Sequence, residues 1–118
     1  MSRDNVVLEK SMNFAIRIVK LHGILKERKC EFKIAEQLLK SGTSIGANIN
    51  EAVQGQSRGD FVSKMNIALK EAFETDYWLE LFHRTSYLTK EEYESIISDC
   101  IELKKILISI VKTTKEKI

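Results

Sequence analysis

Residues 34–53 read IAEQLLKSGTSIGANINEAV and carry the clearest helical pattern of the chain. Its apolar and small residues recur at intervals of three and four, the spacing of one face of an α-helix. Two such stripes lie side by side and together cover an arc of roughly 160°, wider than a surface helix needs. We therefore expect a helix buried against more than one neighbour. The stripes are Ile34, Leu38, Ser41, Ile45, Ile49 and Ala52, and Ala35, Leu39, Gly42, Gly46 and Val53.

Two glycines lie inside this helical pattern, Gly42 and Gly46. A glycine in a helix interior costs about 1 kcal/mol relative to alanine. We expect the close approach of another helix to offset that cost.

The same periodicity continues on both sides of the central stretch and predicts four helices, at about 4–28, 33–54, 59–86 and 90–115. Ser57 and Thr89 each precede an acidic residue by three positions, a helix-start pattern. Short connections place consecutive helices antiparallel. The sequence thus predicts an all-α fold, an antiparallel up-down-up-down four-helix bundle, as a single domain over residues 1–118.

The composition agrees with long helices in a soluble domain. The 118 residues are 43% hydrophobic and 31% charged, with no proline and only five glycines. The start of the chain has no apolar core of a signal peptide, and no run of about 18 apolar residues suggests a membrane span. With only two cysteines, we expect no disulfide framework and a cytoplasmic protein without membrane contact.

Catalytic and metal-binding motifs are missing, so we expect no enzyme, no cofactor and no metal site. We interpret His22 and His83 as packed or solvated side chains. Cys30 is expected to be a loop thiol and Cys100 a small core residue. The single Glu-x-x-His match, Glu80 to His83, lacks the second copy that a di-iron bundle requires.

Basic side chains recur every seven residues in the first helix. Such a row can follow the phosphates of RNA or DNA, although the net charge is only +2. The alternative is an ordinary solvated stripe. The candidate nucleic-acid-binding residues are Arg3, Lys10, Arg17 and Lys20, joined by Lys40 and Arg58.

Apolar side chains off the main stripe of the third helix exceed what one bundle core can hide, which indicates self-association. Aromatic residues dominate the energetics of interfaces, so Phe73, Tyr77 and Trp78 are the candidate anchors. The alternative is that they pack inside the monomer. Beside the stripe of the second helix, Asn48 and Glu51 are expected to hydrogen-bond across helices and fix their register.

Three segments are specific enough to suggest a family: SIGANINEA (44–52), SRGDF (57–61) and IALKEAFETDYWL (67–79). They resemble the bacterial four-helix-bundle family, also called the ribosomal-RNA intervening-sequence or ribosomal protein S23-like family. The resemblance implies a homopentameric ring. It also implies a kinship with the accessory variability proteins of diversity-generating retroelements, which bind nucleic acid and a reverse transcriptase through a basic surface.

The chain departs from that family in its basic residues. Many members carry two arginines late in the first half of the second helix, where residues 37–41 here read QLLKS. Many also have proline at the position of Gly46. These departures weaken the expectation of nucleic-acid binding and leave the fold and assembly unaffected.

Two hypotheses of function follow. The first is a non-enzymatic homo-oligomer that binds RNA or DNA weakly through phosphates. The second is a structural or adaptor protein that binds a protein partner and no nucleic acid. An enzyme or metal-binding bundle ranks well below both.

Overall fold

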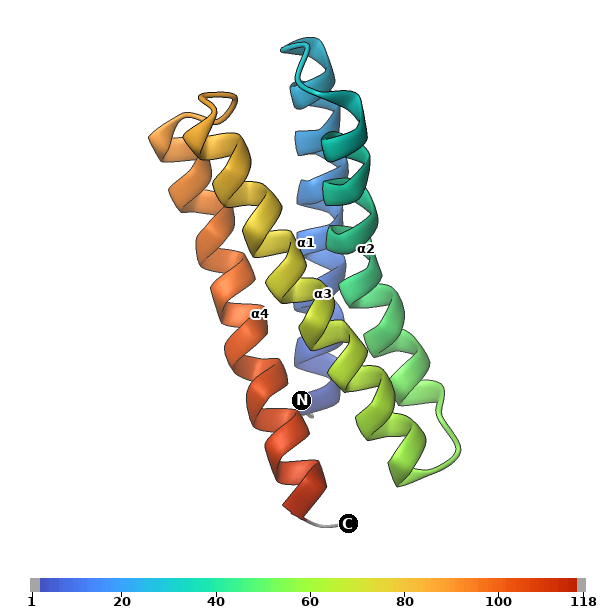
Figure 1. The fold of residues 1–118 in the computed structure, drawn as a ribbon. Helices are drawn as coiled ribbons and strands as arrows, with labels where there is room; N and C mark the ends of the chain where they lie inside the picture. Colours follow the sequence, from blue (N-terminus) through green and yellow to red (C-terminus); the bar gives the residue numbers. More distant parts are fainter. Residues whose placement is uncertain (1–2, 117–118) are drawn as a thin grey trace.

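A computed structural model describes residues 3–116 of the chain. Four α-helices follow one another, α1 (Arg3–Glu27), α2 (Phe32–Gln54), α3 (Arg58–Arg84) and α4 (Lys90–Glu116), and no strand occurs among the described residues. They form a rod of 46 × 22 × 22 Å in which each helix runs antiparallel to the next (Figure 1). The predicted up-down-up-down four-helix bundle is confirmed.

The helices begin where side chains bind their free N–H groups. Ser57 accepts a hydrogen bond from the N–H of Asp60. Thr89 and Glu92 form a reciprocal pair, in which each side chain accepts from the other's backbone N–H. The α2 helix starts one residue earlier than expected, because Glu31 accepts from the N–H groups of Lys33 and Ile34.

Two helices end earlier than the sequence indicated, and both ends have the same geometry. Lys29 and Ser86 adopt left-handed φ values of 58° and 67°. Just beyond each, the N–H of Cys30 bonds to the carbonyl of Leu25, and that of Tyr87 to the carbonyl of Phe82. This closing motif usually has glycine at the left-handed position, so Lys29 and Ser86 carry no sequence signal for it.

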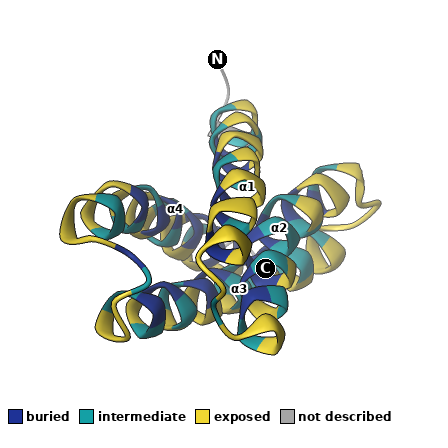
Figure 2. Ribbon diagram, turned by 90° about the horizontal axis from the view of Figure 1, so that it is seen from above, coloured by how far each residue is buried: buried dark blue, intermediate teal, exposed yellow. Residues whose placement is uncertain are grey.

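The helices surround one core in the order α1, α2, α3, α4 (Figure 2). Neighbours in this order pack closely, whereas the backbones of the diagonal pairs, α1 with α3 and α2 with α4, stay farther apart. The apolar stripes point inward, and the largest fully buried side chains include Phe14, Ile18, Ile45, Leu79 and Phe82. The α1/α2 flank and the α3/α4 flank are therefore opposite sides of the rod.

The close approach expected at the glycines of α2 is present. A Cβ atom on Gly42 would lie 2.7 Å from Cγ1 of Ile18, which is fully buried in α1. On Gly46 it would lie 3.3 Å from Oγ of Ser11. Gly42 therefore makes room for the side chain of Ile18, and Gly46 lets α2 approach the backbone of Ser11.

We predict that Gly42→Ala destabilises the protein although alanine is the better helix former. Overpacking a core costs about 1–3 kcal/mol, whereas the gain in helix propensity is about 1 kcal/mol. The matched control is Gly23→Ala in α1, since a Cβ there meets nothing within 4 Å. Urea unfolding should show Gly42→Ala less stable and Gly23→Ala at least as stable as wild type. Equal stability of the two variants would contradict the close-approach argument.

Candidate interaction surfaces

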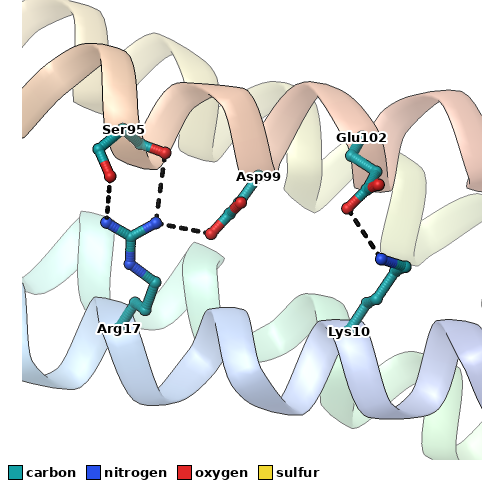
Figure 3. Close-up of polar contacts among 5 residues, drawn as sticks. All are labelled: Lys10, Arg17, Ser95, Asp99 and Glu102. Carbon is teal, nitrogen blue, oxygen red and sulfur yellow. Dashed lines mark hydrogen bonds and ion pairs between the residues drawn. The ribbon is translucent and has the colours of Figure 1, made fainter.

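The basic stripe of α1 lies along the boundary with α4, where it meets acidic side chains. Lys10 Nζ is 3.1 Å from a carboxylate oxygen of Glu102. The guanidinium of Arg17 donates to Asp99 at 2.6 Å, and also to the carbonyl and hydroxyl oxygens of Ser95 at 3.2 and 2.9 Å (Figure 3). These side chains bridge from α1 to α4 rather than projecting outward alone.

A third bridge closes the upper end of the same boundary. Arg28, just past the end of α1, donates to both carboxylate oxygens of Glu92 at 2.8 and 2.7 Å and to the carbonyl of Tyr87 at 2.8 Å. The α1 and α4 helices approach each other less closely than the other three neighbouring pairs. Charge pairing thus joins α1 and α4 where packing is thinnest.

The six predicted nucleic-acid-binding residues do not form one surface. Lys10 and Arg17 form ion pairs across the α1–α4 boundary, and the side chain of Arg3 lies outside the described part of the structure. Lys20 is exposed beside α4. The two remaining members are Lys40, exposed on α2, and Arg58, at the first residue of α3.

Lys40 lies on the side of α2 that faces α3. Burial raises the pKa of Glu71 on α3, Glu74 raises it further, and the charge of Lys40 opposes the rise. Lys20 and Lys40 therefore lie at different helix boundaries, and no continuous basic track connects them. Nucleic-acid binding stays a prediction, with fewer cations available for it than the sequence indicated.

Of Asn48 and Glu51, which were expected to hydrogen-bond across helices, only Glu51 contacts another helix, and it does so through an exposed ion pair. The amide of Asn48 donates to the carbonyl of Ser44 in its own helix, which corrects the expectation for Asn48. Glu51 pairs with Lys64 of α3 at 3.4 Å. A buried contact that was not predicted joins α2 and α3, where the hydroxyl of Thr75 donates to that of Ser41 at 3.0 Å.

Three titratable side chains that could be reactive, those of Cys100, His22 and His83, are engaged in packing. Burial raises the pKa of Cys100 to about 12, and its thiol donates to the carbonyl of Ala72. Such a thiol stays protonated and inert. His22 contacts Glu36 across α1 and α2 at 2.6 Å, and His83 stacks on Tyr93 with ring centroids 4.3 Å apart.

One apolar surface lies on the α1/α2 flank. A hollow of about 340 Å³ opens between these helices, and we call it the α1/α2 groove. Large apolar side chains of α1 stand beside it, with Met12 60% and Val19 54% exposed. By spacing alone, both belong to a second apolar stripe of α1 that a bundle helix would turn inward. The groove is lined by Leu8, Ser11, Met12, Ala15, Thr43, Gly46, Ala47 and Asn50.

A second apolar surface lies on the opposite, α3/α4 flank. Phe73 and Tyr77, one turn apart on α3, are 52% and 62% exposed. Lys104 of α4 reaches across to Asp76 and places its ammonium 4.9 Å from the centre of the Phe73 ring. Ile101 and Ile108 flank Lys104 on α4 and are also exposed. We call Phe73, Tyr77, Ile101 and Ile108 the α3/α4 ridge.

Of the three aromatic residues predicted as interface anchors, two are on this ridge. Trp78 instead packs half-buried against the core. Its indole N–H donates to Glu74 at 3.2 Å, and its ring meets that of Tyr77 edge-on with centroids 5.0 Å apart. Trp78 therefore supports Tyr77 from within the subunit.

These features define an all-α antiparallel four-helix bundle whose outer flanks carry apolar surfaces. The family described as 23S rRNA-intervening sequence protein matches residues 3–109, and the chain belongs to this family. A crystal structure of a protein with unknown function from the S23 ribosomal protein family of Bacteroides thetaiotaomicron VPI-5482 is 59% identical. The two superimpose with a TM-score of 0.90, over 94% of this chain and 99% of that one.

No curated protein matches the chain. Within the described residues, no helix is both long enough and apolar enough to cross a membrane.

We predict that the Arg17–Asp99 bridge contributes measurable coupling that salt removes. Both side chains are about 40% exposed, so a double-mutant cycle with alanine should give about 0.5–1 kcal/mol. Unfolding measured in about 1 M NaCl should reduce it strongly, because the Debye length there is about 3 Å. The i,i+4 pair Glu80–Arg84 is the control and should show less coupling. Coupling that does not fall with salt would exclude an electrostatic bridge.

We predict that Glu92 contributes to stability at neutral pH and that acid removes this contribution. The hydrogen bonds from Arg28 and, secondarily, from Thr89 lower the pKa of Glu92 from 4.5 to about 2. A carboxyl with a lowered pKa in the folded state stabilises above its unfolded pKa and loses the effect as pH falls. The loss should therefore span pH 4.5 to about 2.

Melting temperatures across this range test the prediction. Glu92→Gln should flatten the acid limb of the curve, whereas Glu94→Gln should keep it, since Glu94 makes only a 3.9 Å contact with Lys90. Identical acid limbs for wild type and Glu92→Gln would show that the Arg28–Glu92 bridge does not form in solution.

Proposed function

We propose that this protein is a non-enzymatic subunit that works by assembling with copies of itself. The single observation that carries the proposal is the pair of apolar surfaces on opposite flanks of the rod. A helix of a lone bundle keeps a polar outer face, and contiguous exposed apolar surface usually marks an interaction site.

The exposed side chains are large and belong to well-formed helices. Met12, Val19, Phe73 and Tyr77 each leave at least half of their surface in contact with solvent. Fully burying a side chain of this size contributes roughly 1.5–3 kcal/mol, so burying the exposed half contributes about half of that. Several such contacts, repeated at each junction between subunits, can offset the entropy lost on association.

Self-association ranks before nucleic-acid binding because of where the cations lie. Two members of the basic stripe of α1 are neutralised by α4, and the net charge of +2 is small. A protein partner remains the alternative occupant of the apolar surfaces. The resemblance noted from the sequence implies a ring of five, and we propose a closed homo-oligomer of that kind.

Light scattering on the purified protein, with absorbance read at 260 and 280 nm, tests the proposal. We expect a mass that is a multiple of 13.6 kDa at micromolar concentration and an absorbance ratio typical of pure protein. A mass of 13.6 kDa at all concentrations would overturn the proposal. A high ratio at 260 nm that salt removes would favour nucleic-acid binding instead.

A further inference from the structure

We propose that the bundle opens and closes along the α1/α4 boundary, with α2 and α3 as the hinge and the ion pairs across the boundary as a salt-sensitive latch. The four helices form two hairpins, α1 with α2 and α3 with α4. Residues 55–57 link the hairpins beside α2 and α3, so no connecting segment of the described chain spans the α1/α4 boundary (Figure 1). The opening belongs to the single subunit and does not depend on self-association.

The hinge side is the most tightly packed part of the described chain. The α2 and α3 helices make a more extensive contact than any other pair. A hydrogen bond between the hydroxyls of Ser41 and Thr75 joins them, and both residues are at most 1% exposed. Because this contact is buried, dissolved ions screen it little. A motion between the two hairpins therefore keeps α2 against α3.

The α1/α4 side has the opposite character. These helices make the least extensive contact of the four neighbouring pairs, and a hollow indents each end of their boundary. The upper hollow, of about 410 Å³, reaches Leu21 and Ile96, which are 8% and 3% exposed. The lower hollow, of about 390 Å³, opens between Val6 and Ile106. Proteins open locally where few apolar contacts must break, and this boundary is such a place.

Three ion pairs hold the α1/α4 side closed, and each joins α1, or the residue just beyond its end, to α4. In every pair both side chains are about a third or more exposed, so salt screens the attraction. Loss of one such pair should favour the open form about two- to fivefold. The latch therefore responds to salt, whereas the hinge does not. The three pairs are Lys10–Glu102, Arg17–Asp99 and Arg28–Glu92.

Opening exposes one part of the core and leaves another part covered. Leu103 of α4 follows the latch residue Glu102 and is only 1% exposed in the closed bundle. Ala68 of α3 is fully buried and lies two turns before Thr75 on the same face of the helix. Opening along the α1/α4 boundary should bring solvent to Leu103 and not to Ala68.

Thiol labelling tests the opening. A chain with Cys30→Ser and Cys100→Ala receives a single cysteine, Leu103→Cys or Ala68→Cys, and reacts with the uncharged reagent N-ethylmaleimide. Raising NaCl from about 0.01 M to about 1 M shortens the Debye length from about 30 Å to about 3 Å. We expect the Leu103→Cys thiol to react severalfold faster at high salt and the Ala68→Cys thiol to keep its rate. Equal rates for the two thiols, or a Leu103→Cys rate that salt does not change, would overturn the proposal.

Variants of the latch test its role at low salt. Arg17→Ala and Arg28→Ala should each raise the Leu103→Cys rate about two- to fivefold. The matched control is Arg84→Ala, which removes a cation whose partner, Glu80, lies on the same helix, and it should leave the rate unchanged. An equal rise in all three variants would indicate a general loss of stability and would count against the latch.

A second reporter serves if Leu103→Cys loses its helical circular dichroism. Ile96→Cys is on the same helix, at the floor of the upper hollow. Its labelling should also accelerate with salt and in Arg28→Ala. A rate that stays constant under both changes would overturn the proposal.

Discussion

The close packing of α2 against α1 and α3 holds the bundle in its arrangement. Gly42 lets α2 settle onto Ile18 of α1 at a distance that no side chain at position 42 would permit. On the other side, the hydroxyls of Ser41 and Thr75 hydrogen-bond between α2 and α3 in a fully buried position. A shift of α3 along α2 would break this bond, although each hydroxyl would keep a carbonyl of its own helix as a partner. The second helix therefore fixes both of its neighbours.

The fourth helix, α4, is held to its two neighbours by different kinds of interaction. It packs on α3, but its approach to α1 is looser, and bridges such as Arg17–Asp99 and Arg28–Glu92 join the two. These bridges occupy cations that would otherwise face solvent. The ion pairs that join α4 to α1 thus also neutralise cations on the surface that would bind phosphates. The bundle leaves large apolar side chains exposed on the flanks away from this boundary.

Membership of the 23S rRNA-intervening sequence family and the close match to the Bacteroides structure establish the fold. Neither specifies a ligand, a reaction or a partner for this chain. A function must therefore be argued from the surfaces. The exposed apolar surfaces favour association between helical subunits. Side chains that could be reactive, such as the thiol of Cys100, are buried or packed.

The fold class, the order of the four helices and the deep burial of the helix at 34–53 could all be predicted from the amino-acid pattern. These features follow from local periodicity and capping, which neighbouring residues encode. Which face of each helix meets which neighbour could not be predicted, because it depends on residues far apart in the chain. Lys10 and Arg17 resemble a solvated row in sequence, because their carboxylate partners lie about 80–90 residues away. Met12 and Val19 fit a core stripe by spacing alone, yet the packed bundle leaves both more than half exposed. Periodicity defines a helix face, but only packing decides whether that face is buried.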